Sequence, residues 1–178
     1  MTSRMRRRLL AATLAAPFAR RASAQPLTCG TQTPRQTEGP FFTPDSPRRT
    51  SLVEKGAKER FVLEGLVLTP QCRPVANALV DLWHADEQGE YDNRGFRYRG
   101  HTFTDAEGRY RFETIVAGLY PGRTRHYHVK VQAPKRRILT TQLYFPGEPG
   151  NARDGIHRPE LEMKVDKDTG RFDFVVDA

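Results

Sequence analysis

The sequence has 178 residues, a formal net charge of +8 at pH 7 and two cysteines. Six arginines lie within the first 24 residues, which contain no acidic residue, so the formal charge falls from +8 to +2 when that segment is set aside. So small a positive surplus is a poor match to nucleic acid, and we expect no nucleic-acid partner. Residues 25–178 are enough for one domain with a single hydrophobic core.

Residues 1–24 have the pattern of an export signal. An arginine triplet at residues 6–8 precedes an apolar run over residues 9–19, and Ala-Ser-Ala at residues 22–24 matches an A-x-A cleavage site. The arginines resemble a twin-arginine signal. An uncleaved membrane anchor is the alternative, but the apolar run is far shorter than the roughly 20 residues of a spanning helix, so we expect no stable membrane span. The prediction is export to the periplasm or the extracellular space, with the signal removed near Ala24.

The two cysteines, Cys29 and Cys72, follow this signal. An exported chain folds in an oxidising compartment, where an isolated pair is most simply a disulfide. Two unrelated thiols are the alternative, and a lipid anchor on Cys29 is a further one, although Leu27 and Thr28 before it make a poor lipidation motif. We expect a disulfide between Cys29 and Cys72.

The rest of the chain predicts short strands separated by turns, and no long helix. Residues 60–69 are rich in Val and Leu, and residues 109–116 alternate aromatic with charged side chains, which is the period of a half-buried strand. The other expected strands cover residues 77–84, 98–104, 126–132, 140–145, 161–165 and 171–176, with a turn at 105–108 and a hairpin at 168–170 joining the last two. Strands at this spacing predict an all-β fold, a single β-sandwich of the prealbumin or immunoglobulin type.

The strand expected over residues 126–132 carries two histidines one residue apart, His126 and His128. Side chains alternate across a strand, so both histidines share one face with Lys130, while Tyr127 points to the other face. Such a pair can direct two imidazoles at one metal ion, but the same pattern also suits a solvated polar face. The other histidines lack this spacing and are expected to be structural or surface residues: His84, His101 and His157.

Two tyrosines, Tyr91 and Tyr120, add phenol oxygens to the candidate site. A bound cation can hold a phenol as an anion at neutral pH, although its ordinary pKa lies near 10. Zinc sites draw mainly on Cys, His, Asp and Glu, whereas imidazole also suits iron, so two His with two Tyr point to Fe(III). Taken singly, each tyrosine is more often a structural aromatic residue at the end of a sandwich.

In its ordered combination of motifs the sequence resembles the intradiol ring-cleavage dioxygenases, the family of protocatechuate 3,4-dioxygenase and catechol 1,2-dioxygenase, especially their short exported members. The resemblance covers about residues 29–147. Its motifs are Thr-Glu-Gly-Pro-Phe-Phe at 37–42, the run from Trp83 to Tyr91, Gly-Leu-Tyr-Pro-Gly-Arg-Thr-Arg-His-Tyr-His at 118–128 and Thr-Gln-Leu-Tyr-Phe at 141–145. Tyr127 stands where an aliphatic residue is more usual, and Ala85 replaces a cysteine seen in some exported relatives.

The resemblance implies that residues 25–178 form a catalytic domain with one Fe(III) per chain. The implied metal ligands are Tyr91, Tyr120, His126 and His128. Arg123 and Gln142 are implied to lie beside a bound catechol, where Arg123 stabilises developing negative charge and Tyr120 accepts a substrate proton. The implied reaction uses O2 to open the catechol ring between its two hydroxyl-bearing carbons, which gives a muconate-type dicarboxylic acid.

Two other functions remain open from the sequence. Stretches around residues 65–80 and 104–120 also resemble non-catalytic exported binding modules, the transthyretin-like and carboxypeptidase-regulatory-like β-sandwiches, which need neither His-x-His nor Arg123. An exported metal-binding protein without turnover is the third alternative. Metal analysis and oxygen uptake with a catechol separate these three.

The surroundings of the expected site also allow predictions. Only five residues separate Tyr120 from His126, fewer than in protocatechuate dioxygenase relatives. We therefore expect a wide, solvent-facing mouth that accepts catechols with bulky or polar substituents, unless a homo-oligomer covers it. Residues 37–42 either line this pocket or simply pack against the sandwich as an ordinary N-terminal segment.

Overall fold

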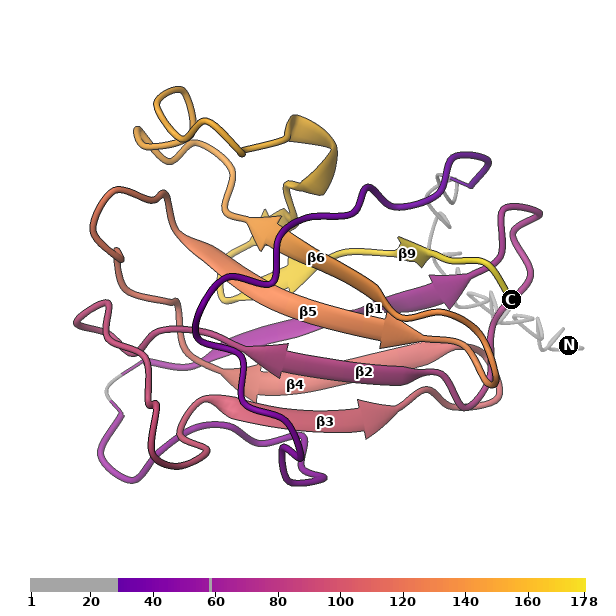
Figure 1. The fold of residues 1–178 in the computed structure, drawn as a ribbon, viewed down its shortest axis with the longest axis horizontal. Helices are drawn as coiled ribbons and strands as arrows, with labels where there is room; N and C mark the ends of the chain where they lie inside the picture. The colour runs from indigo at the N-terminus through magenta and orange to yellow at the C-terminus, as the bar shows by residue number, and fades with distance from the viewer. Residues whose placement is uncertain (1–28, 58) are drawn as a thin grey trace, which may run out of the picture.

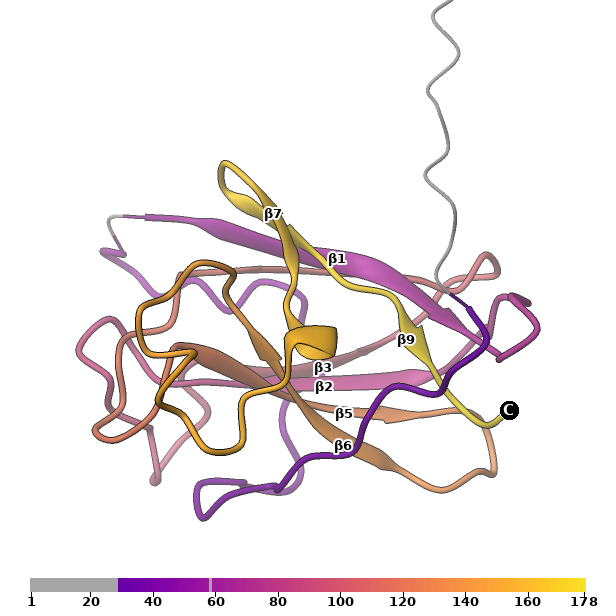
Figure 2. The same cartoon turned by 90° about the horizontal axis from the view of Figure 1, so that it is seen from above.

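Two β-sheets packed face to face make up the described part of the chain, which is residues 29–57 and 59–178 of a computed structural model (Figures 1 and 2). One sheet has the strand order β3-β2-β5-β6, and the other has β4-β1-β8-β7 with β9 also paired to β1. The all-β sandwich expected from the sequence is confirmed. The export signal expected at residues 1–24 lies outside the described residues.

The strands agree closely with the hydrophobic pattern in the first two thirds of the fold. They are β1 (Phe61–Leu68), β2 (Leu79–Trp83), β3 (Arg99–Phe103), β4 (Arg109–Thr114), β5 (His126–Gln132), β6 (Leu139–Tyr144), β7 (Lys164–Asp166), β8 (Thr169–Arg171) and β9 (Phe174–Val175). A single turn of 3-10 helix, η1 (Pro159–Leu161), precedes β7. Within the described ranges, no helix has the length and apolar character needed to cross a bilayer.

The C-terminal strands differ from the sequence prediction. The strand expected over residues 161–165 is wrong at its start, because Leu161 ends the 3-10 helix and β7 begins at Lys164. The hairpin turn lies at Lys167, which has a φ of 54°, and it joins β7 to β8 rather than to a strand over residues 171–176. The chain beyond β8 pairs in parallel with β1 as β9. Parallel pairing with a distant strand leaves no local turn signal, so sequence periodicity could not show this arrangement.

The hydrophobic core fills the space between the two sheets. On β5, Tyr127, Val129 and Val131 belong to this core, as the alternation of side chains predicts. The Tyr127 hydroxyl donates a hydrogen bond to Ile115 O at 2.6 Å, so this large residue is accommodated in the core with its polar atom satisfied. The histidines of β5 therefore lie on the outer face of their sheet.

A stretch without regular secondary structure, the crossing segment (residues 33–48), runs over this outer face from β6 to β3 (Figure 1). It contacts the strands in their spatial order. Gln36 N donates to Thr140 O on β6 at 2.9 Å, and Ser46 Oγ donates to Asp81 Oδ1 on β2 at 2.9 Å. The outer face of β5 is thereby covered, and His126 and His128 are buried beneath peptide that is far away in the sequence.

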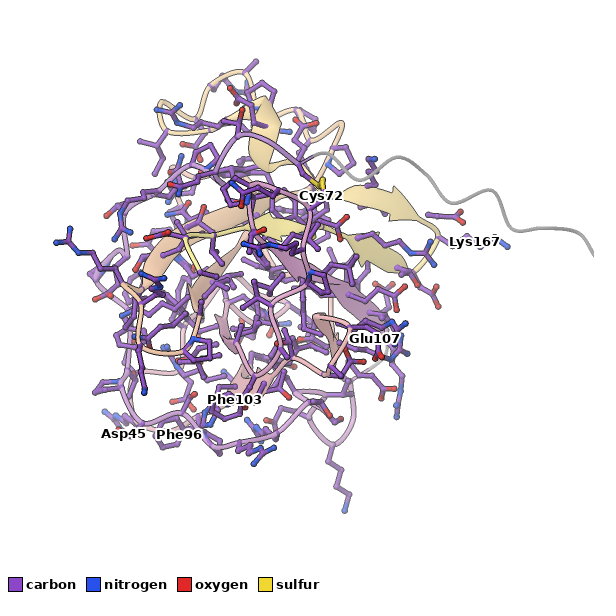
Figure 3. The ribbon with its side chains drawn as sticks, turned by 90° about the vertical axis from the view of Figure 1, so that its right-hand side faces the viewer. Asp45, Cys72, Phe96, Phe103, Glu107 and Lys167 are labelled. Atoms are coloured by element: carbon purple, nitrogen blue, oxygen red, sulfur yellow. A yellow bond between two sulfur atoms is a disulfide. The ribbon has the colours of Figure 1, made fainter. Side chains whose placement is uncertain are left out.

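The start of the crossing segment is fixed to the body of the sandwich. Cys29 and Cys72 form a disulfide, as predicted, which ties the segment to the turn between β1 and β2 (Figure 3). Thr33 and Val175 also exchange two hydrogen bonds, with Thr33 N donating to Val175 O and Val175 N donating to Thr33 Oγ1. These contacts set the path along which residues 37–42 reach the histidines.

Candidate metal centre

The register of the β3-β2-β5-β6 sheet places three residues, Trp83, His128 and Gln142, in one row. Trp83 on β2 is opposite His128 on β5, and His128 is opposite Gln142 on β6. Directly opposed residues on antiparallel strands have side chains within about 5 Å of each other. His126 is opposite Tyr144 two positions along the same face, so the row continues with a second histidine.

Three donor atoms meet above this row. Tyr91 Oη lies 3.1 Å from His128 Nε2 and 3.3 Å from His126 Nε2, and the two Nε2 atoms are 3.1 Å apart. No group of three or more His, Cys, Asp or Glu side chains suited to a metal is found among residues 29–57 and 59–178, so this cluster is distinguished by its phenol.

The protonation of the two histidines favours metal binding. His126 Nδ1 donates to Thr124 O at 2.7 Å, which leaves the lone pair on Nε2. Burial lowers the pKa of His126 to about 4, with Arg123 as a further cause, and burial lowers the pKa of His128 well below its ordinary value. Both imidazoles are therefore neutral at pH 7, which is the form that binds a metal.

The ring of His128 is held by its neighbours. It stacks on Trp83, with ring centroids 4.9 Å apart and an angle of 12° between the planes. Gly39 of the crossing segment lies against the same ring, where an added Cβ would come within 3.3 Å of His128 Cε1. Gly39 also has a φ of 72°, a conformation that favours glycine. The ring is thus fixed with Nε2 directed toward Tyr91 and His126.

A cation fits this arrangement better than hydrogen bonding does. His128 Nδ1 is buried and has no hydrogen-bond partner, so nothing in the protein holds the His128 proton on that nitrogen. When both Nε2 atoms carry lone pairs, as metal binding requires, the phenol proton is the only proton in the triangle, and lone pairs face each other along the remaining edges. Donor atoms that each lie about 2.1 Å from one cation are separated by about 3.0 to 3.4 Å at ordinary ligand angles. Burial also raises the pKa of Tyr91 above its ordinary value, so this phenol ionises at pH 7 only beside a cation.

Two loops bring the tyrosines to the histidines. Tyr91 lies within the loop between β2 and β3, and Tyr120 lies within the loop between β4 and β5. The loops approach closely at Gly118, whose N donates to Asp86 O at 2.8 Å and whose added Cβ would lie 2.4 Å from that oxygen. Only glycine permits this approach. The Tyr120 ring lies edge-on to Tyr91, with centroids 5.8 Å apart, and is partly exposed.

Phe41 of the crossing segment contacts both tyrosines. Its ring stacks on Tyr91 at 4.4 Å between centroids and meets Tyr120 edge-on at 5.2 Å. The neighbouring Phe42 packs edge-on against Trp83 at 4.9 Å and lies beneath the ammonium group of Lys130. Of the two sequence alternatives for residues 37–42, the structure therefore favours the one in which they line the candidate site.

Arg123 and Gln142 are in direct contact beside the cluster. Arg123 Nη2 donates to Gln142 Oε1 at 2.7 Å, and Tyr144 Oη donates to the same oxygen at 3.0 Å. Gln142 Nε2 donates to Thr37 O at 3.0 Å, which fixes the orientation of the amide. Arg123 Nε donates to Asp154 Oδ2 at 2.8 Å. The structure therefore brings the donor atoms of Tyr91, His126 and His128 together and places Arg123 and Gln142 beside them. Tyr120 adjoins them through ring contacts, and Asp154 is an addition to the set selected from the sequence.

The remaining histidines have partners elsewhere. His84 contacts Thr114, His101 contacts Ser46, and His157 contacts Glu162. These contacts agree with the structural roles expected from their spacing. Asp154, which sequence reasoning missed, lies in the β6–η1 loop (residues 145–158), 31 positions beyond Arg123. No local motif could have indicated it. The stacking of Trp83 on His128 depends on the register between β2 and β5, which the sequence does not predict.

A broad hollow on the described surface lies away from this cluster. It covers the outer face of the other sheet, where Arg111 donates to Glu64 at 2.9 Å and Arg171 donates to the same carboxylate at 2.9 Å. None of the candidate site residues lines it. Its lining mixes exposed charged side chains with neutral ones such as Thr102, Phe103 and Tyr110, and it contains no histidine.

Comparison with known proteins gives a consistent result. The model of a family described as dioxygenase matches residues 37–175. The beta chain of protocatechuate 3,4-dioxygenase from Burkholderia cepacia is 37% identical over 132 residues, which cover 64% of this chain and 56% of that protein. Catechol 1,2-dioxygenase 2 from Acinetobacter lwoffii is 32% identical over 146 residues, which cover 66% of this chain and 52% of that protein. The chain thus spans about half the length of the curated relatives it matches.

A solved structure matches more of the chain. It is the dioxygenase domain of a dioxygenase carbohydrate-binding protein fusion from the cellulolytic bacterium Streptomyces sp. SirexAA-E. The two chains are 51% identical and superpose with a TM-score of 0.79, and the match covers 83% of this chain and 99% of that one. The similarity therefore extends across most of the sandwich.

Proposed function

Because the chain belongs to the intradiol ring-cleavage dioxygenase family, we propose that it is a non-haem Fe(III) dioxygenase acting on catechol-type diols. In this proposal O2 opens the ring between the two hydroxyl-bearing carbons, and the product is a muconate-type dicarboxylic acid. One Fe(III) per chain is held by Tyr91, Tyr120, His126 and His128. We further propose that the chain is exported, with the signal removed near Ala24.

The observation that carries the proposal is the triangle formed by one phenol oxygen and two imidazole nitrogens, with edges of 3.1 to 3.3 Å. Bound Fe(III) would supply the electron-accepting centre through which a catecholate becomes reactive toward O2. The protein contributes neutral imidazoles, a buried phenol and a rigid surround in which Trp83 and Gly39 fix one of the rings.

Tyr120 is the candidate proton acceptor. A catechol must lose two hydroxyl protons to bind as a dianion, so bases have to be present beside it. Tyr120 is less buried than the core tyrosines and is positioned by aromatic contacts rather than by a hydrogen-bonded row of strands. Beside a bound cation Tyr120 would be held as a phenolate, and its Oη could then take up one of these protons with little disturbance of the sheet, while hydroxide would take up the other.

Arg123 and Gln142 are proposed to bind and orient the substrate. Arg123 stays positively charged at all relevant pH values, and its Nε and Nη2 are already engaged by Asp154 and Gln142. The guanidinium is thus held in one orientation before substrate arrives. A fixed positive charge stabilises the negative charge that develops on the ring during cleavage, without reorganisation at the moment of reaction.

The non-catalytic binding module is less well supported. Such a module accounts for the sandwich, but it has no use for neutral imidazoles grouped with a phenol, nor for an arginine held against Gln142. The passive metal-binding protein accounts for the donor atoms but not for the arginine. Turnover therefore has to be measured directly.

The test uses the purified chain loaded with ferric iron. We expect about one iron per chain, a red-brown absorption band from tyrosinate-to-Fe(III) charge transfer, oxygen uptake with catechol, and an intradiol product. Iron binding with the band but without oxygen uptake would support the passive binder. Absence of both would support the module, and an extradiol product would contradict the proposed reaction.

A further inference from the structure

The β6–η1 loop (residues 145–158) folds back onto the segment that precedes His126. Thr124 Oγ1 donates to Asn151 Oδ1 at 2.7 Å, and Gly150 packs so closely that an added Cβ would lie 2.9 Å from the Thr124 hydroxyl oxygen. Asn151 Nδ2 in turn donates to Phe145 O at 2.9 Å, which ties the loop to its own beginning. The loop is therefore compact and packs directly against Thr124.

The carboxylate of Asp154 in this loop contacts two residues beside the site, Arg123 and Thr124. Asp154 Oδ2 accepts hydrogen bonds from Arg123 Nε at 2.8 Å and from Thr124 N at 3.0 Å. Its other oxygen, Oδ1, accepts from Ile156 N at 3.1 Å. Thr124 O is the acceptor that fixes the ring of His126. Asp154 thus restrains the guanidinium directly and restrains a metal-binding ring through a single residue.

The partial burial of this ion pair, greater for the carboxylate than for the guanidinium, indicates a role beyond stability. The Asp154 side chain is 3% exposed and that of Arg123 is 21% exposed. A buried ion pair loses much of its Coulomb attraction to desolvation, and an apolar pair of the same size often stabilises a protein equally well. An apolar residue in place of Asp154 could not fix the direction of the Arg123 guanidinium, because that requires an acceptor in the plane of its N–H groups.

Gln142 completes the restraint from the other side. It accepts from Arg123 Nη2 at 2.7 Å. The plane of the guanidinium is therefore determined by two acceptors, Gln142 on β6 and Asp154 in the β6–η1 loop. Gln142 is itself held by Thr37 and Tyr144. Without Asp154, Arg123 would keep one acceptor and could rotate about it, and the backbone at Thr124 would lose its only side-chain acceptor among the described residues.

We propose that Asp154 is a positioning residue for the reaction, which sets the direction of Arg123 and, through Thr124, the ring of His126. This inference rests on the proposed function for its kinetic consequence but not for its structural one. Removing residues that orient metal ligands or charged groups from outside typically costs about 10- to 100-fold in activity or metal affinity. We expect a loss of that size in kcat/KM for Asp154→Ala.

The experiment combines a mutant cycle with a matched control. The variants are Asp154→Ala, Arg123→Ala, the double variant, and Glu148→Ala. Glu148 lies in the same loop and pairs with Arg125 at 3.0 Å, so its removal breaks a comparable ion pair two residues away. We expect the control to change kcat/KM by no more than about twofold, since a partly exposed pair contributes little. Asp154→Asn keeps the volume and one acceptor, and it serves if the alanine variant does not fold.

The cycle separates positioning from general destabilisation. The part of the loss that passes through Arg123 should disappear in the Arg123→Ala background, and only the part that passes through Thr124 should remain, so the two losses are less than additive. Additive losses, or equal losses in Asp154→Ala and Glu148→Ala, would overturn the proposal. Thermal midpoints of all variants show whether a loss in rate reflects folding instead.

A measurement on metal-free protein makes the outcome independent of turnover. In the nitrogen-15 NMR spectrum, the Arg123 Nε–H signal should be protected from solvent exchange in the wild type and in Glu148→Ala, and should exchange at least about tenfold faster in Asp154→Ala. Unchanged protection in Asp154→Ala would refute the positioning role. A wild-type chain without turnover but with this pattern of protection would contradict the proposed function and leave the role of Asp154 supported.

Discussion

The disulfide between Cys29 and Cys72 should stabilise the domain without shaping the site at room temperature. The perturbation is the double variant Cys29→Ser with Cys72→Ser, which leaves no single reactive thiol. In the folded state, the crossing segment stays attached through the two Thr33–Val175 hydrogen bonds and through Gln36 N, which donates to Thr140 O at 2.9 Å. Phe41 and Gly39 should therefore remain on the cluster.

The size of the effect follows from the length of chain that the bond closes. The cysteines are 43 positions apart, for which the chain-entropy model gives about 4 kcal/mol of stabilisation, acting through the unfolded state. For a domain of this size, about 4 kcal/mol corresponds to a fall of about 8 to 16 °C in the melting temperature. Iron content and kcat at 25 °C should change by less than about twofold, because native contacts are retained.

Urea unfolding followed by tryptophan fluorescence measures the first quantity, and oxygen uptake with catechol measures the second. The wild type treated with reductant under mild conditions is the matched control, since it lacks the bond but keeps both residues. A loss of stability below about 1 kcal/mol would contradict the chain-entropy argument. A large loss of iron or activity with little loss of stability would show that the bond, and not the hydrogen bonds, holds the crossing segment on the site.

Further outcomes follow from the site and the core. Tyr91→Phe and His128→Ala should each abolish the visible band and lower kcat/KM by at least about 100-fold, whereas His101→Ala should retain both. Burial lowers the pKa of His84 to about 4, below the unfolded value near 6.5, so the unfolded chain takes up the extra proton and stability is lost as the pH falls between these values. His84→Gln should remove up to about 3 kcal/mol of this dependence between pH 7 and pH 4.5 in urea unfolding. Catechols with growing ring substituents should keep similar kcat/KM values if the mouth is wide, and a sharp preference for unsubstituted catechol would contradict this. N-terminal sequencing of the chain outside the cytoplasm should begin near Gln25, and an intact Met1 there would exclude cleavage.

The part of the site that could be predicted from the sequence is the part carried by short-range regularities. His126 and His128 are one residue apart on a strand, and a period of two is enough to place both rings on one face. Arg123 precedes them within one motif. The strand core was accessible for the same reason, because Tyr127, Val129 and Val131 alternate with polar residues along β5. In each case the information lies within a few residues of the chain.

The parts that could not be predicted depend on which distant segments meet. β9 pairs in parallel with β1, more than 100 residues earlier in the sequence, and no turn motif predicts this pairing. Residues 37–42 cover β5 because the crossing segment contacts β6 before β2, an order set by the hydrogen bonds of Thr33 to Val175 and of Gln36 to Thr140.

Asp154 belongs to the same class as β9, since its partner Arg123 lies 31 positions away across a loop without regular structure. A metal site of this kind is therefore specified at two levels. The donor atoms can be predicted from local periodicity. The direction of Arg123 and of the His126 ring depends on the contact with Asp154, which local spacing does not predict. Substitutions at the donors should abolish metal binding, whereas substitution of Asp154 should change the rate while the metal remains bound. That difference can be measured as a split between iron content and kcat, and it gives the two levels separate experimental signatures.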